Sequence, residues 1–186
     1  MIARHVLALL ISHLAVCALC PALAAGRQPN VILILADDLG YQDLGCYGHP
    51  SIRTPALDRL AGEGARLTDF HSGATVCTPS RMALLTGAYP TRVGWTQGVC
   101  GFMMGDHDGM SPDALTIAEI FKSEGYVTAI SGKWHVGDQL DTRPNAQGFD
   151  STYYLSHSNN QNKKVWRANE VVENPFDNRK LTEQFT

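Results

Sequence analysis

The sequence has little net charge and no long apolar run after its first 24 residues. It carries 15 Lys and Arg against 18 Asp and Glu, so it lacks the basic stripe that a nucleic-acid-binding protein needs. Internal repeats and low-complexity tracts are also missing. With 44% hydrophobic and 18% charged residues, the composition is that of a soluble globular domain. An acidic substrate would therefore have to be held by a local site.

The first 24 residues are predicted to be a secretory signal peptide. Arg4 precedes an almost wholly apolar stretch over residues 6–20, and residues 22–24 form an A-x-A cleavage site. The apolar stretch is too short for a bilayer-spanning helix to be the first choice. We expect an exported protein without stable membrane insertion after cleavage. It would be periplasmic or extracellular, or would lie in the lysosome or ER lumen of a eukaryote.

Cysteine is scarce in the predicted mature chain. Two of the five cysteines lie within the signal peptide, which leaves Cys46, Cys77 and Cys100. Export permits a disulfide between Cys46 and Cys100. Two cysteines in a loop-rich sequence could equally be thiols, so the sequence leaves this pairing open.

Strand and helix patterns alternate along the chain, which predicts an α/β domain with a mostly parallel sheet flanked by helices. A continuous apolar, β-branched run at 31–36 favours a strand buried on both faces. Residues 94–109 form a glycine-rich loop, and the polar stretch 148–186 is expected to be loop as well. The predicted strands are 31–36, 65–70 and 126–130, and the predicted helices are 55–63, with Thr54 as its N-cap, and 116–123.

The segment 77–87, CTPSRMALLTG, places a cysteine at the predicted start of a helix. Pro79 suits the first turn, and Arg81 lies one turn further on. A helix N-terminus and a cation therefore surround the thiol of Cys77, which permits a nucleophilic role. The alternative is a structural cysteine, because free cysteine is among the most buried residue types.

Asp37 and Asp38 directly follow the predicted strand 31–36. Open α/β sheets place their ligand sites at the carboxyl ends of strands. Because adjacent carboxylates repel each other, a pair in this position is best explained by a divalent cation, and oxygen ligands favour Ca²⁺ or Mg²⁺. A solvated turn is the alternative, and these two residues alone leave both open.

The segment 132–135, GKWH, follows the predicted strand 126–130. Lys133 supplies a point charge that can bind a sulfate oxygen or stabilise an alkoxide. His135 can transfer protons near neutral pH. Alone, this pattern is weak, because a single surface lysine is usually solvated.

In combination, these three segments resemble the sulfatase family. The segment 77–87 is similar to the first sulfatase signature, 132–135 to the second, and 37–40, DDLG, to the metal-binding start of the family. The resemblance implies that residues 25–186 are the N-terminal part of a longer catalytic domain with an alkaline-phosphatase-like α/β fold.

The resemblance also implies a modified nucleophile. A formylglycine-generating or sulfatase-maturating enzyme would oxidise Cys77 to formylglycine, whose hydrate is a geminal diol. The bound cation would be Ca²⁺ in preference to Mg²⁺, and a loosely matched stretch after residue 148 would bring Ser158 near the substrate. The implied site consists of Cys77, Arg81, Lys133 and His135 as catalytic residues, Lys133 and Ser158 as substrate ligands, and Asp37, Asp38 and Cys77 as metal ligands.

The predicted activity is hydrolysis of an aryl or carbohydrate sulfate ester. A phosphate or phosphonate ester hydrolase of the same superfamily is an alternative, because a diol nucleophile with a metal can attack phosphorus too. An inactive fragment or a binding protein is a third, because the family's remaining metal and sulfate ligands are expected beyond residue 186. His49, His71 and His107 match no metal spacing and are expected to satisfy local hydrogen bonds.

Overall fold

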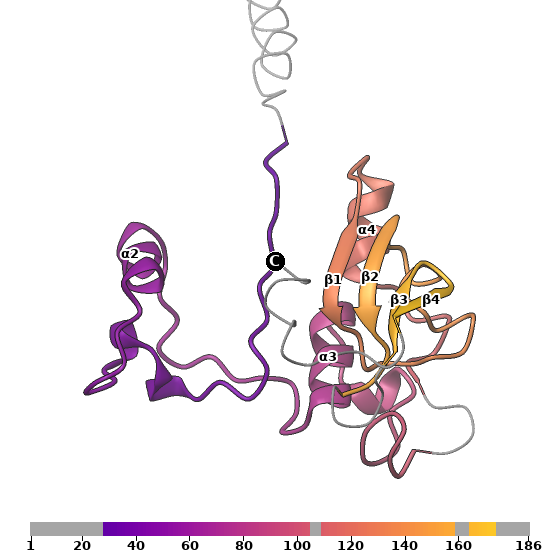
Figure 1. Ribbon diagram of the computed structural model, residues 1–186, viewed down its shortest axis with the longest axis horizontal. Coiled ribbons are helices and arrows are strands. Elements are labelled where there is room, and N and C mark those ends of the chain that lie inside the picture. Colours follow the sequence, from indigo (N-terminus) through magenta and orange to yellow (C-terminus); the bar gives the residue numbers. More distant parts are fainter. Residues whose placement is uncertain (1–27, 105–108, 159–163, 174–186) are drawn as a thin grey trace, which may run out of the picture. The chain divides into compact units, whose positions relative to one another are not determined.

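The computed structural model describes residues 28–104, 109–158 and 164–173 (Figure 1). The chain divides into two compact units, Met1–Gly40 and Tyr41–Thr186. The predicted signal peptide, with its two cysteines, lies outside the described residues. Within the described ranges, no helix is both long and apolar enough to cross a membrane.

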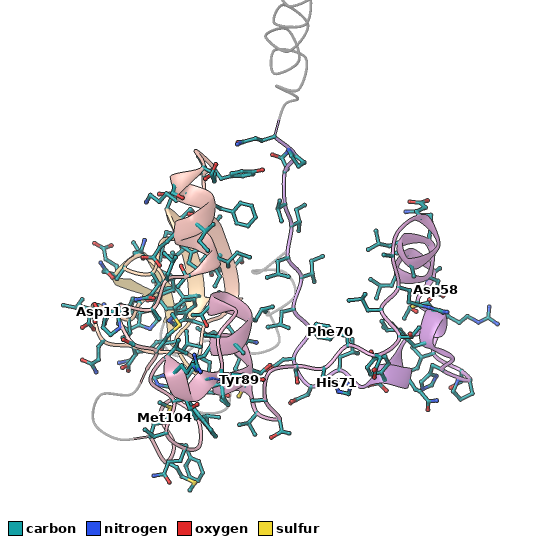
Figure 2. The ribbon with its side chains drawn as sticks, turned by 180° about the vertical axis from the view of Figure 1, so that it is seen from behind. Asp58, Phe70, His71, Tyr89, Met104 and Asp113 are labelled. Carbon is teal, nitrogen blue, oxygen red and sulfur yellow. The ribbon has the colours of Figure 1, made fainter. Side chains whose placement is uncertain are left out.

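In the first unit, the apolar run 31–36 is extended but forms no strand. Its side chains project to both sides of the ribbon (Figure 2), and Ile32 and Ile34 are 84% and 83% exposed. The predicted buried strand is therefore wrong for this structure. A strand buried on both faces needs hydrogen-bonded neighbours and covering helices, and no ladder among the described residues includes this run.

The second unit contains a four-stranded sheet with the order β1-β2-β3-β4. The first pair is parallel, from Ala129 opposite Ser151 to Lys133 opposite Leu155, and the other two pairs are antiparallel. Figure 1 shows the arrows of β1 and β2 pointing the same way. The strands are β1 (Ala129–Lys133), β2 (Ser151–Leu155), β3 (Val165–Arg167) and β4 (Glu170–Glu173).

The sheet corrects two predictions about strands. The strand expected at 126–130 begins three residues later, because Asp150 Oδ2 accepts a hydrogen bond from Thr128 N at 3.0 Å and the ladder starts after it. The loop expected over 148–186 contains β2, β3 and β4 in its described part. Its polar composition concealed the buried positions of β2, where Tyr154 is fully buried.

Three α-helices and three short 3-10 helices complete the described elements. The helix predicted at 55–63 is confirmed with the same bounds. The helix predicted at 116–123 begins after Thr116, whose side chain forms a capping box with Glu119. The helices are α2 (Pro55–Glu63), α3 (Cys77–Thr86) and α4 (Ile117–Ser123), with η2 (Tyr41–Asp43), η3 (Gly45–Tyr47) and η4 (Pro90–Arg92).

Side-chain hydrogen bonds organise the segment around α2. Asp58, labelled in Figure 2, accepts hydrogen bonds from Cys46 N at 2.7 Å and Thr54 Oγ1 at 2.8 Å. Thr54 precedes α2 as predicted but makes no side-chain cap. The strand predicted at 65–70 is absent, because the hydroxyls of two tyrosines bind the Leu67 carbonyl in place of a ladder.

The core of the second unit lies between α3, the sheet and the loops that connect them. The aromatic ring of Trp134 is held edge-on to Phe149, with the ring centroids 5.9 Å apart. This packing fixes the chain immediately after β1. The buried residues of this cluster are Met82, Val93, Met110, Trp134, Val136 and Tyr154.

Candidate active site

Two hydrogen bonds join the start of α3 to the carboxyl end of β1. Arg81 Nη1 donates to the Lys133 carbonyl at 2.6 Å, and Thr78 Oγ1 donates to the His135 carbonyl at 2.7 Å. In Figure 1, the arrowhead of β1 ends beside α3. The segments 77–81 and 132–135, distant in sequence, therefore form one junction.

Cys77 is the first residue of α3 and is half-buried. Val76 precedes it in an extended conformation and provides no side-chain cap. The first turn of a helix has backbone N–H groups without intrahelical partners, and the helix dipole favours negative charge there. Pro79 lies in the first turn of the helix, as expected, and both Thr78 and Pro79 are buried. Residue 77 is thus held at a helix end suited to an anionic oxygen.

His135 is fully buried and adopts a left-handed backbone conformation with φ 61°. The backbone N–H of His135 donates to the Ser156 carbonyl at 3.0 Å, which ties His135 to the residue that follows β2. Its Nε2 lies 3.0 Å from the Cys100 carbonyl. Because a carbonyl only accepts, Nε2 carries the proton, and Nδ1 of the neutral ring keeps a lone pair. Within the described part of the chain, Nδ1 is buried without a hydrogen-bond partner.

The surroundings of His135 favour its neutral form. Burial is the largest cause, and it lowers the pKa of His135 to about 4; the positive charge of Lys133 acts in the same direction, and the hydrogen bond to the Cys100 carbonyl partly opposes them. A buried acceptor that lacks a partner is rare and calls for a reason. The neutral Nδ1 of His135 can accept a proton from a reacting group near pH 7.

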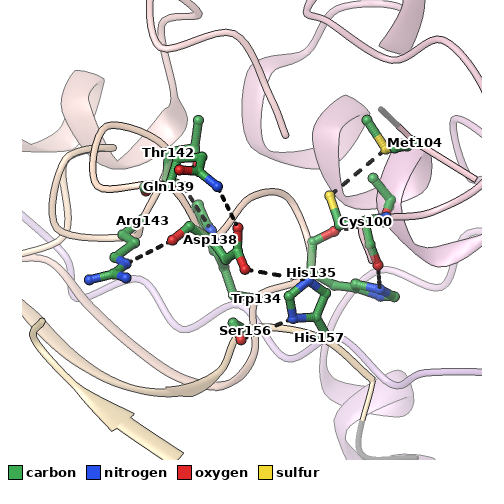
Figure 3. Close-up of polar contacts among 11 residues, drawn as sticks. Cys100, Met104, Trp134, His135, Asp138, Gln139, Thr142, Arg143, Ser156 and His157 are labelled. Carbon is green, nitrogen blue, oxygen red and sulfur yellow. Dashed lines mark hydrogen bonds and ion pairs between the residues drawn. The ribbon is translucent and has the colours of Figure 1, made fainter. Parts of the chain in front are cut away.

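Cys100 connects α3 to His135 from the glycine-rich loop. Its backbone N–H donates to Thr78 Oγ1 at 3.0 Å, and its carbonyl accepts from His135. Its sulfur lies 3.9 Å from Met104 Sδ (Figure 3). Among the described residues, Cys46, Cys77 and Cys100 form no disulfide, which settles the question that the sequence left open.

Comparison with known proteins decides the family. The sequence model described as Sulfatase matches residues 29–185. The chain belongs to the sulfatase family.

Its relatives are considerably longer than this chain. Human Arylsulfatase A is 47% identical over 146 residues, which cover 77% of this chain and 28% of that protein. Mouse Steryl-sulfatase is 51% identical over 120 residues, which cover 63% of this chain and 19% of that protein. The chain thus spans less than a third of the curated relatives that it matches.

Solved structures agree with the alkaline-phosphatase-like α/β fold expected from the sequence. The structure of Ps i-CgsB superposes with a TM-score of 0.73 at 30% identity, and the match covers 84% of this chain and 39% of that one. The same protein has been solved in complex with k-i-k-neocarrahexaose. The fold class is confirmed, although two of the three strand pairs described in this sulfatase-family chain are antiparallel.

Of the three predicted metal ligands, Asp37 and Asp38 belong to the first unit and Cys77 belongs to the second. Asp37 and Asp38 are exposed, and Asp38 has φ 57°. Their carboxylates suit Ca²⁺ by donor type, but two side chains provide fewer than the 6–8 oxygens that Ca²⁺ takes. Across the described ranges, no group of three or more His, Cys, Asp or Glu could hold a metal ion. The pair therefore fits part of a cation site.

Ser158 is half-buried at the end of a described range, and it stays a prediction. The structure brings two residues to the junction that the predicted site did not include, Ser156 and His157. Ser156 Oγ lies 3.1 Å from His157 Nδ1, and the His157 ring meets the His135 ring edge-on at a centroid distance of 5.9 Å. The signal was the SHS triplet directly after β2. Residues that follow two parallel neighbouring strands share one edge of a sheet.

The remaining histidines behave as local groups where they are described. His49 Nδ1 accepts hydrogen bonds from the backbone of Ser51 and Ile52, and His71 lies 3.0 Å from Asp69. Both confirm the expectation from sequence. His107 lies outside the described residues.

Proposed function

We propose that the full-length protein is an exported sulfuric ester hydrolase with formylglycine at position 77. Family membership supports this, and the observation that carries it is the hydrogen-bonded junction of α3 and β1. The Arg81–Lys133 and Thr78–His135 hydrogen bonds tie the first turn of α3, which carries residue 77, to the segment that carries Lys133 and the neutral His135. Residues 25–186 would be the N-terminal part of the catalytic domain.

The reaction would use the two hydroxyl oxygens of the formylglycine hydrate. One hydroxyl oxygen attacks sulfur and loses its proton, the sulfur–oxygen bond to the alcohol breaks, and the departing alcohol oxygen gains a proton in exchange. Residue 77 then carries the sulfate as an ester. The second hydroxyl gives its proton to His135 Nδ1, the bond between carbon and the sulfated oxygen breaks, and the aldehyde returns. A serine has no second hydroxyl and would stop at the sulfated form.

Two cations would stabilise the charge that develops on these oxygens. Lys133 ends β1, and the guanidinium of Arg81 is anchored by its bond to the Lys133 carbonyl. Charge-assisted hydrogen bonds of this kind are about twice as strong as neutral ones. At comparable sites, removal of one such donor costs about 2.7–4 kcal/mol of transition-state stabilisation.

Asp37 and Asp38 would hold the divalent cation together with residue 77 and further oxygen ligands. When bound, the cation supplies Lewis-acid charge that polarises the sulfate and favours ionisation of the diol. We propose Ca²⁺, because adjacent carboxylates in an exposed, irregular segment suit its flexible coordination better than the strict octahedron of Mg²⁺.

Two substrate classes are consistent with the relatives. Arylsulfatase and steryl-sulfatase names point to sulfates of aryl and sterol alcohols, and the neocarrahexaose complex of Ps i-CgsB points to a carbohydrate. We propose an aryl or carbohydrate sulfate ester, with Lys133 and Ser158 contacting the sulfate side of the substrate. A formylglycine-generating or sulfatase-maturating enzyme would be the maturation partner.

The test is a comparison of leaving-group-matched substrates. The full-length protein, co-expressed with a formylglycine-generating enzyme and supplied with Ca²⁺, should hydrolyse 4-nitrophenyl sulfate with a higher kcat/KM than 4-nitrophenyl phosphate. A higher value for the phosphate ester would favour the phosphate or phosphonate hydrolase. No turnover of either ester by the matured protein would favour a binding protein.

A further inference from the structure

We propose that Asp138 and His157 form a positioning pair that fixes the ring and the tautomer of His135. As far as catalysis is concerned, the inference rests on the proposed function. In structural terms it rests on contacts of its own. The edge-on contact of His157 with His135 places a second imidazole directly against the candidate base.

The orientation of His157 is set from both of its ring nitrogens. Nε2 lies 3.9 Å from Asp138 Oδ2, and Nδ1 lies 3.1 Å from Ser156 Oγ (Figure 3). Nε2 faces Asp138 Oδ2, and Nδ1 shares with Ser156 Oγ a hydrogen bond whose donor depends on the tautomer of His157. At 3.9 Å the carboxylate acts by electrostatic attraction and not by a hydrogen bond. The His157 side chain is only 11% exposed, which weakens solvent screening of that attraction.

Asp138 is itself held in place. Arg143 Nε donates to the Asp138 carbonyl at 2.9 Å, and Gln139 Nε2 donates to Asp138 Oδ1 at 3.3 Å. The Arg143 guanidinium lies 4.4 Å from the centre of the Trp166 ring in β3. Contacts therefore run from Trp166 in β3 through Arg143 and Asp138 to His157, and Figure 3 shows the part from Arg143 to His157.

Gly101 links His157 to the partner of His135. A Cβ on Gly101 would stand 2.6 Å from His157 Cδ2, so Gly101, which follows the Cys100 peptide carbonyl, packs closely against the His157 ring. The carbonyl of that peptide accepts the Nε2–H of His135. His157 thus supports both the ring of His135 and the carbonyl that selects its tautomer.

The positive groups around His135 make this support necessary. Burial most of all, and then Lys133 and Arg81, disfavour a protonated His135, so the ring is neutral and has two possible tautomers, and only the Nε2–H form keeps Nδ1 available as a base. If His157 were removed, the Cys100 carbonyl and the His135 ring would both gain room to move. A misplacement of about 1 Å in a catalytic group can cost about 100-fold in rate.

The experiment uses the full-length protein, matured at residue 77 and labelled with ¹⁵N-histidine. Imidazole NMR should report the Nε2–H tautomer for His135 in the wild type. In His157→Ala, we expect a mixture of tautomers and a fall in kcat of between about 10- and 100-fold, with KM for 4-nitrophenyl sulfate changed less than about twofold. His157→Gln, whose amide can replace both ring contacts, should recover most of kcat, and Asp138→Asn should lie between.

His71→Ala is the matched control, since His71 also faces an aspartate, Asp69, but is exposed; it should change neither the tautomer nor kcat. If His157→Ala misfolds, Gly101→Ala displaces the ring in its place. Gly125→Ala controls for backbone strain, because both glycines have positive φ and nothing lies within 4 Å of a Cβ at Gly125.

An unchanged His135 tautomer in both His157→Ala and Gly101→Ala would overturn the inference. If the variants change the His135 tautomer but the matured wild-type protein hydrolyses no ester, the positioning pair is upheld and the proposed function is rejected. The two failures are therefore distinguishable.

Discussion

The segment 31–38 and the junction of α3 with β1 both carry predicted site residues, yet they are held very differently. At the junction, Thr78 and His135 are fully buried and joined by a hydrogen bond. In the segment 31–38, the apolar side chains are exposed and the two aspartates follow them on an exposed turn. The site residues at the junction are held by contacts inside the second unit, whereas Asp37 and Asp38 are recognised as site residues by their residue types alone.

The difference has a physical cause. A helix satisfies its own backbone groups, and α3 then needs only a few side-chain bonds to fix it against β1. An extended run makes no hydrogen bonds within itself, and its order depends on partner strands. Metal ligands placed at the end of such a run share that dependence.

The largest effect should come from the nucleophile. Cys77→Ser in the matured full-length protein should lower kcat by more than about 1,000-fold, because a serine can be sulfated but lacks the second hydroxyl that releases sulfate. Initial rates on 4-nitrophenyl sulfate measure this. Cys46→Ser is the control and should keep wild-type activity; comparable losses in the two variants would contradict a special role for residue 77.

The next effect concerns the cation anchored at the junction. Arg81→Ala removes the donor to the Lys133 carbonyl and should lower kcat/KM by about 100- to 1,000-fold. Steady-state kinetics test this, with Arg92→Ala, an exposed arginine in η4, as the matched control. A loss below about threefold would remove Arg81 from the site.

A stability comparison tests the contrast between the two regions directly. Met82→Ala in the buried core should lower the free energy of unfolding of the 186-residue chain by about 2–5 kcal/mol. Ile34→Ala, at an exposed position, should change it by less than about 0.5 kcal/mol. Urea denaturation followed by tryptophan fluorescence gives both values. Equal losses would mean that the segment 31–38 is packed as firmly as the junction.

The smallest effect is a pH dependence. The pKa of His135 is lowered to about 4 from 6.5, so the unfolded chain binds this proton more tightly. The contribution of neutral His135 to the free energy of unfolding is therefore fully present above about pH 6.5. It is lost as the pH falls to about 4, a change of up to about 3 kcal/mol. Asp150 stays ionised in this window, because its hydrogen bonds to Lys122 and Thr128 lower its pKa to about 2.

Urea denaturation at pH 7 and at about pH 4.5 measures the difference. It should be smaller in His135→Gln than in the wild type, and unchanged in the exposed variant His71→Gln. A wild-type stability that is flat over this range would contradict a buried neutral His135.

Local signals predicted the helices well, and the chemistry assigned to the site stays a prediction. The bounds of α2 follow from its apolar spacing and Gly64, and α4 begins at the capping box of Thr116 and Glu119. The residues of the junction are recognisable by type, because a cysteine, a cation and a histidine in these patterns suit few other purposes.

Features that depend on strand pairing were not predictable. The Thr128–Asp150 bond that sets the start of β1 joins residues 22 apart, and the place of His157 beside His135 follows from the parallel register of β1 and β2. Cys100 reaches the site through backbone groups, which leave no trace in residue type. The run 31–36 failed for the same reason, because its apolar pattern predicts a strand but says nothing of the neighbouring strands that it would need.

Mass spectrometry of residue 77 tests the central claim most directly. The tryptic peptide from Leu67 to Arg81 contains Cys77 as its only cysteine. From active protein matured in the presence of a formylglycine-generating enzyme, we predict a peptide with the mass of the aldehyde, reactive toward hydrazides and inert to thiol alkylation. Active protein whose residue 77 is entirely an alkylatable thiol would contradict the account.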